Sequence, residues 1–114
     1  MKIQINDHRK IFAFQEEFNK FFPHLKIEFL AKPSKVGNPP SGKMIKGTSK
    51  RLGDCRVVHS KGELTLSPSM TATDLKQTLS DIYGLSIIIF RRSGTEWVET
   101  TETDNFSLKE QGAV

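Results

Sequence analysis

One segment of the chain has the spacing of a phosphate-binding motif. Residues 37–44, GNPPSGKM, match the P-loop pattern at Gly37, Gly42 and Lys43. In that motif the backbone and the lysine hold phosphates, and a Ser or Thr hydroxyl after the lysine binds Mg²⁺. Met44 occupies the hydroxyl position, and no helical pattern follows that would place a helix start at a phosphate. We therefore do not expect a nucleoside triphosphatase.

Cys55 and His59 are the second chemical candidate. Four residues apart, they would share one face of a strand, and a thiolate beside an imidazole serves as a nucleophile or as half of a metal site. No further ligand or orienting group lies near them in the sequence, because His8 and His24 belong to other segments. We expect a buried thiol and a surface histidine, and Cys55 stays the best nucleophile if an enzymatic activity exists.

Pairs of carboxylates are the third candidate, at Glu16-Glu17 and at Glu99-Glu102-Asp104. General acid and base catalysis needs two carboxylates in a cleft that separates their pKa values. We expect these to be solvated charges on a helix face and in an acidic tail. The sequence therefore predicts no catalytic residue, no metal ligand and no cofactor.

Positive charge is concentrated in the middle of the chain. The formal net charge is +4, yet residues 32–61 hold eight of the seventeen lysines and arginines and only one acidic residue, Asp54. Residues 93–114 carry a net charge of −4, so we expect an electrically polarised molecule. Residues 31–54 also hold three of the five prolines and four of the eight glycines. With so few apolar residues to bury, this segment is predicted to be a long, flexible basic loop.

This loop supports the leading functional prediction, a small binding module for a polyanion. Lysines spaced by Gly, Ser and Pro can follow a phosphate backbone and release its counterions without a fixed shape. The predicted contacts to nucleic acid, weak and tolerant of sequence, come from Lys32, Lys35, Lys43, Lys46, Lys50 and Arg51. The alternative for the loop itself is a solvated insertion without a partner.

The residues before the loop read as strand, helix and strand. Ile3 and Ile5 alternate with polar residues, which indicates a strand over 2–6 with one buried face. Asp7 is expected to cap the helix that follows, whose apolar residues recur every three or four positions up to Pro23. Residues 24–30 alternate again.

The residues after the loop follow a similar order. Residues 56–59 and 63–67 read as extended, either as a hairpin or as one bulged strand. Thr71 with Asp74 fits a capping box and Gly84 a left-handed helix end, and the predicted buried residues between them are Leu75, Leu79, Ile82 and Tyr83. A nearly all-apolar strand over 85–90, a turn at Ser93-Gly94 and a strand over 95–101 come next. Residues 104–114 are expected to form an acidic, partly ordered tail.

This element order predicts one α+β domain over residues 1–114. Two strand-helix-strand units favour a ferredoxin-like two-layer sandwich with an added C-terminal hairpin strand, and a ubiquitin-like roll is the alternative. The predicted hairpin places Phe90 opposite Trp97 and gathers Ile88, Phe90, Arg92 and Trp97 on one sheet face. The loop, the tail or a second copy could cover that face. The alternative function is therefore a protein-interaction or homodimerising domain that uses Phe90, Arg92 and Trp97.

Several short runs resemble a family of small, functionally uncharacterised bacterial proteins. The runs are RKIFA at 9–13, QEEFN at 15–19, YGL at 83–85, RRSG at 91–94 and TDNFSL at 103–108, with Trp97 and Thr100-Thr101 between the last two. The resemblance covers nearly the whole chain and implies a bacterial, cytosolic origin but no activity, cofactor or binding residue. A cytoplasmic location is also expected because no apolar run approaches about 18 residues and the chain begins with polar residues.

Overall fold

Two helices and five strands form among the residues that the computed structural model describes, 1–31, 43–45 and 49–113. They are β1 (Lys2–Ile5), α1 (Ile11–Phe21), β2 (Leu25–Phe29), β3 (Gly62–Thr65), α2 (Ala72–Tyr83), β4 (Ile87–Ser93) and β5 (Glu96–Glu99). Short 3₁₀ turns lie at Leu52–Cys55, Thr101–Thr103 and Glu110–Ala113. The predicted α+β class is confirmed.

Helix α2 begins and ends where its sequence signals predict. The Thr71 hydroxyl accepts a hydrogen bond from the Asp74 N–H at 3.0 Å, and the Asp74 carboxylate accepts one from the Thr71 N–H at 3.2 Å. Gly84 ends the helix with φ of +64°, a conformation that favours glycine. One prediction for this helix is wrong, since the side chain of Ile82 is 54% exposed rather than buried.

The start of α1 differs from the prediction. The helix begins at Ile11 with Lys10 as its N-cap, and no side chain caps it. The Asn6 side chain instead accepts hydrogen bonds from the N–H groups of His8 and Arg9, at 3.0 and 2.9 Å, and forms a turn before the helix. The carboxylate of Asp7, the predicted cap, instead accepts hydrogen bonds from Arg56, which lies forty-nine positions later in the chain.

The strands divide between two antiparallel sheets. Strand β1 pairs with β3, while β2, β4 and β5 form a three-stranded sheet with β4 in the centre. The predicted ferredoxin-like sandwich is not confirmed, because that arrangement places its strands in a single sheet. Helix α1 packs against β1 and β2, and α2 packs against β4, so both helices contribute to one core.

The β4–β5 hairpin corrects the predicted register. Ser93 pairs with Glu96, so the turn is Gly94-Thr95 rather than Ser93-Gly94. Gly94 has φ of +62° and stands first in the two-residue turn, a position where glycine is favoured. Trp97 therefore lies opposite Arg92, and Phe90 lies opposite Glu99.

The described parts of the predicted basic loop contact the folded body. The Ala31 N–H donates to the Lys43 carbonyl, and the Ile45 N–H donates to the Phe29 carbonyl, both at 2.8 Å. Leu52 is fully buried in the 3₁₀ turn Leu52–Cys55. Residues 32–42 and 46–48 of the predicted loop lie outside the described residues. Beyond it, residues 56–61 are irregular, and β3 is shorter than either predicted alternative.

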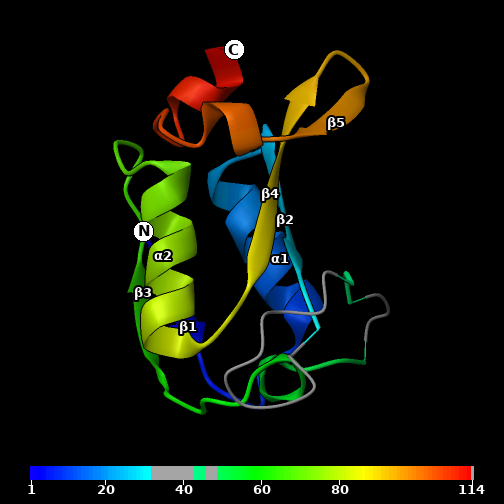
Figure 1. Cartoon of the computed structure of the whole chain (residues 1–114), viewed down its shortest axis with the longest axis vertical. Helices are drawn as coiled ribbons and strands as arrows, with labels where there is room; N and C mark the ends of the chain where they lie inside the picture. Colours follow the sequence, from blue (N-terminus) through cyan, green and yellow to red (C-terminus); the bar gives the residue numbers. More distant parts are fainter. Residues whose placement is uncertain (32–42, 46–48, 114) are drawn as a thin grey trace.

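The C-terminal residues complete the start of α2. The Ala72 and Thr73 N–H groups donate to the carbonyls of Phe106 and Asp104, at 3.3 and 3.0 Å. Leu108 is fully buried in the core. Figure 1 shows β5 and the C-terminal turns at one end of the longest axis and the turn Leu52–Cys55 at the other. In the described part of the chain, neither helix is long and apolar enough to cross a membrane.

Candidate interaction surface

The three-stranded sheet has one face in the core and one face directed away from it. Because side chains alternate along a strand, the buried Leu25, Ile27 and Phe29 of β2 and Ile87 and Ile89 of β4 define the core face. The alternate residues of β2 and β4, together with the residues of β5 that pair with them, define the opposite face, and each is partly or fully exposed. We call this surface the outer face; its residues are Lys26, Glu28, Leu30, Ile88, Phe90, Arg92, Trp97 and Glu99.

Two aromatic rings and two cations meet on the outer face. The Lys26 ammonium lies 5.0 Å from the Phe90 ring centroid and 5.4 Å from the Trp97 ring centroid. The Arg92 guanidinium lies 6.0 Å from the Trp97 ring centroid. Each such cation–π contact contributes about 0.5–1 kcal/mol at a partly exposed site. The structure thus brings Phe90, Arg92 and Trp97 together as predicted, with Lys26 as an additional member.

The sequence reasoning missed Lys26 because no local signal links it to Phe90. The alternation in residues 24–30 places Lys26 opposite the buried face of β2, but only the pairing of β2 with β4 sets Lys26 beside Phe90. That pairing joins segments more than sixty positions apart in the chain. A prediction of the strand order was needed to find it.

An apolar stripe crosses the outer face diagonally. An antiparallel bridge sets Leu30 opposite Met44, so their side chains lie on the same face, and Met44 is 39% exposed. Ile88 and Phe90 occupy β4 next to them, and Trp97 follows on β5. We call these five residues the apolar stripe: Trp97, Phe90, Ile88, Leu30 and Met44.

The charges on the described part of the outer face balance. Lys26 and Arg92 are positive, whereas Glu28 and Glu99 are negative. Glu28 lies 4.0 Å from the Lys26 ammonium and accepts a hydrogen bond from the Gln15 side chain at 3.1 Å. Glu99 accepts one from the Thr101 hydroxyl at 3.2 Å. With no net charge here, the outer face offers little general attraction to a polyphosphate chain.

The predicted polyanion-binding residues are described only in part. Lys32, Lys35 and Lys46 lie outside the described residues, and Lys43 lies beside the end of β2. Lys50 and Arg51 are exposed at the start of α1, where the Ile11 N–H donates to the Lys50 carbonyl at 3.0 Å.

Lys10 pairs with one of these residues, Arg51, through an antiparallel bridge, which sets the side chains of Lys10 and Arg51 on one side. We call Lys10, Lys50 and Arg51 the basic cluster. It lies at the start of α1 and beside the turn Leu52–Cys55, which Figure 1 shows at the opposite end of the longest axis from β5 and the C-terminal turns. Lys10 was missed because the bridge that recruits it is not local in sequence.

A second polar cluster joins Asp7, Arg56 and His59. The buried Arg56 guanidinium donates two hydrogen bonds to one Asp7 carboxylate oxygen, at 3.1 and 2.9 Å, and one to the Tyr83 carbonyl at 3.0 Å. The other Asp7 oxygen lies 2.9 Å from Nδ1 of His59. The hydrogen bond from His59, together with the hydrogen bond and charge of Arg56, holds the pKa of the Asp7 carboxyl below its usual value.

This cluster forms a structural clip between two distant segments of the chain. Arg56 connects the turn before α1 with the last carbonyl of α2, so it fixes two parts of the chain to each other. Among the hydrogen bonds of the described residues, none joins His59 to a hydroxyl or thiol nucleophile. The described residues also contain no group of three or more His, Cys, Asp or Glu side chains that could hold a metal.

Cys55 is not placed to act as a nucleophile. It lies in a 3₁₀ turn rather than on a strand with His59, so the predicted shared face does not form. Its thiol donates to the Leu52 carbonyl at 3.2 Å, and burial raises its pKa to about 11. The thiolate that nucleophilic attack requires is therefore scarce at neutral pH.

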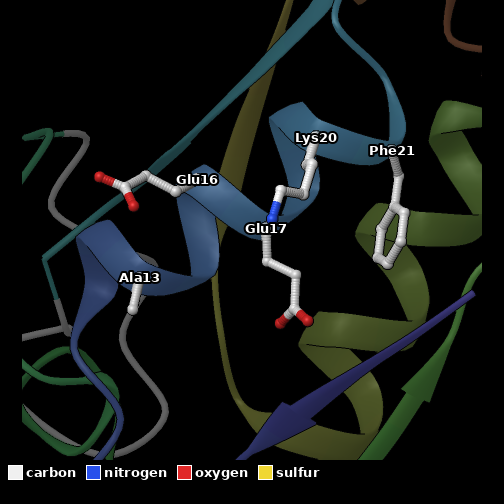
Figure 2. A pocket seen from close by; sticks show the side chains of 5 residues that line it. All are labelled: Ala13, Glu16, Glu17, Lys20 and Phe21. Carbon is white, nitrogen blue, oxygen red and sulfur yellow. The ribbon is translucent and has the colours of Figure 1, made fainter.

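The carboxylates on α1 do not form a catalytic pair either. A surface hollow of about 390 Å³ lies along α1. Figure 2 shows that the carboxylates of Glu16 and Glu17, two of its lining residues, point in different directions. Glu17 is also bound to Arg9 at 2.6 Å.

Comparisons with protein-family models, with curated proteins and with solved structures found no match.

Proposed function

We propose that this protein is a small binding module that docks a partner protein on the apolar stripe. The observation that supports this most is a continuous row of five partly exposed apolar side chains on the outer face. Trp, Phe, Met and Arg are enriched in protein interfaces, where Trp and Arg often supply most of the binding energy. Balanced charges beside the row suit the rim of such an interface better than a phosphate-binding surface.

Trp97 is the expected centre of the binding energy. Truncation of a central tryptophan typically costs about 2–4 kcal/mol of binding free energy, which corresponds to roughly 30- to 1,000-fold in Kd. Lys26 and Arg92 contact the ring from their own chain and hold it in place before a partner arrives. Such preorganisation reduces the side-chain entropy that binding would otherwise cost.

Site-specific photocrosslinking in the native cells tests this proposal. A photoreactive phenylalanine analogue replaces Ile88 in the stripe, and in a matched control it replaces Phe106, which is 38% exposed at the C-terminal end. We expect protein adducts, identified by mass spectrometry, at position 88 and not at position 106. The substitution Trp97→Ala in the same chain should abolish them. Equal labelling at both positions, or adducts that persist in the Trp97→Ala chain, would refute the proposal.

Polyanion binding is the second candidate function, and the basic cluster is the observation that favours it. Lys10 stands beside Arg51, and Lys50 precedes Arg51, so three cations project at one end of the molecule. Of the two acidic residues near this cluster, Asp54 accepts a hydrogen bond from the Arg51 backbone N–H at 2.8 Å, and Asp7 is paired with Arg56. Three phosphate contacts would give single-stranded DNA binding a logarithmic salt slope of about −2.

Filter binding of a single-stranded DNA oligonucleotide tests this second candidate. We expect retention to fall steeply between about 50 and 200 mM salt. Replacing Lys10 with Gln should reduce the slope by about 0.7, whereas Lys109→Gln in the acidic C-terminal segment should leave it unchanged. No retention at low salt, or retention that ignores salt, would eliminate the polyanion hypothesis.

A further inference from the structure

We infer that the partner on the apolar stripe is a second copy of this chain, related by a two-fold axis that runs along the stripe. The inference rests on the proposed function, since it names the occupant of the same surface. It follows from the placement of charge on the two sides of the stripe. Lys26, Arg92 and Glu28 lie on one side, towards β2 and the end of β4, where Glu28 lies 4.0 Å from the Lys26 ammonium and the net charge is +1. Glu99 lies on the other side, on β5.

The strand register fixes these positions. Lys26, Phe90 and Glu99 form one row across β2, β4 and β5, with Phe90 in the middle. Arg92 and Trp97 form the adjacent row. The stripe runs diagonally through Phe90 and Trp97, so it separates the cations from Glu99. A surface with opposite charges on either side of an apolar row can be complementary to itself.

Only one of the two in-plane axes makes that complementarity favourable. Rotation about an axis across the stripe would lay the cations of one copy against the cations of the other. Rotation about an axis along the stripe lays Glu99 of each copy between Lys26 and Arg92 of the other. The same rotation lays the apolar stripes of the two copies against each other. An isologous contact contains every pair twice, which doubles the effect of any one pair.

Sedimentation equilibrium of the purified full chain over a wide concentration range is the first measurement. We expect a concentration-dependent dimer, and Trp97→Ala should weaken its Kd by about a hundredfold or more. Lys26→Glu and Glu99→Lys should each weaken it by roughly tenfold, because each change replaces two attractive pairs with repulsive ones. Lys109→Glu, the same charge change away from the stripe, should have no effect. Circular dichroism confirms that each variant is folded.

Mixing the two charge variants gives the decisive result. A Lys26→Glu chain and a Glu99→Lys chain should form a mixed dimer, because position 26 of each then meets the opposite charge at position 99 of the other. Neither variant alone should dimerise as well. Recovery of the dimer only on mixing requires position 26 of one copy to lie beside position 99 of the other. The mixing experiment therefore tests the two-fold axis directly.

Failure of the inference and failure of the proposed function are distinguishable. A chain that stays monomeric at every concentration, while Ile88 photocrosslinks to a different protein, would overturn the second copy as partner and leave the docking surface standing. A dimer that Trp97→Ala does not weaken would show that copies associate elsewhere, and it would also overturn the inference. A dimer that the charge variants weaken without rescue on mixing would overturn the proposed axis.

Discussion

Replacing Asp7 with Ala should strongly destabilise the fold. The substitution leaves Arg56, whose side chain has no solvent exposure, with the Tyr83 carbonyl as its one remaining hydrogen-bond partner among the contacts described. Removing one member of a buried ion pair typically costs about 3–5 kcal/mol of unfolding free energy. Asp7 itself is 37% exposed, and water reaching its position moderates the loss, so we expect a value of about 3 kcal/mol. At roughly 4 °C per kcal/mol, Tm should fall by about 12 °C.

Urea unfolding followed by circular dichroism measures this loss, with the slope of free energy against denaturant unchanged. His59→Ala is the matched control, since His59 is over half exposed and its pairing with Asp7 should contribute at most about 1 kcal/mol. Asp7→Asn, which keeps an acceptor but loses the charge, should fall between the two. If Asp7→Ala costs no more than His59→Ala, the clip does not hold the fold as argued.

The ion pair between Asp7 and Arg56 also predicts that the stability of the fold depends on pH. The pKa of Asp7 is lowered in the folded protein, so its stabilising contribution is complete above the usual carboxyl value of 3.8. The contribution is lost as the pH falls through the lower folded value. The gap in stability between the wild type and Asp7→Ala should therefore shrink as the pH falls below about 4. A gap that stays unchanged down to about pH 2 would contradict a stabilising role for the charge of Asp7.

Three further substitutions and one chemical treatment test local features. Gly84→Ala should cost about 1–3 kcal/mol in thermal unfolding, because φ is +64° and the new Cβ would lie 2.9 Å from the Val58 Cβ. Gly94→Ala, at similar φ but with open space around it, should cost less; equal losses would contradict the packing argument. Thr71→Ala should cost about 1 kcal/mol through loss of the helix cap. Iodoacetamide at pH 8 should modify Cys55 only after unfolding, and rapid labelling of the native protein would contradict its burial.

Local features of the fold were predictable from the sequence. The caps of α2 depend on Thr71, Asp74 and Gly84, which lie within or next to the helix that they end. The strand β4 follows from a run of apolar residues, and β2 and β5 pair with its two edges. The α+β class needed only these elements and their order. Each signal acts over a few positions, so the rest of the chain does not alter it.

The features that were not predictable depend on contacts between distant segments. Asp7 looks like a helix cap locally, but Arg56, forty-nine positions later, binds its carboxylate. The hairpin turn lies one residue later than predicted because Gly94 occupies its first position. The partner of Trp97 is therefore Arg92 rather than Phe90. The stripe gained Leu30 and Met44 through a bridge that only the folded chain forms. Sequence patterns therefore gave part of the candidate surface, and strand pairing completed it.

The carbonyls of Asp104 and Phe106, which receive the first N–H groups of α2, follow that helix in the chain and are synthesised after it. Helix α2 leaves the ribosome before they do, with an unsatisfied start and an incomplete core that still lacks Leu108. A nascent chain that stalls before residue 104 would expose apolar surface to chaperones and proteases. Cells would therefore recognise copies that terminate before residue 104 as unfolded and remove them.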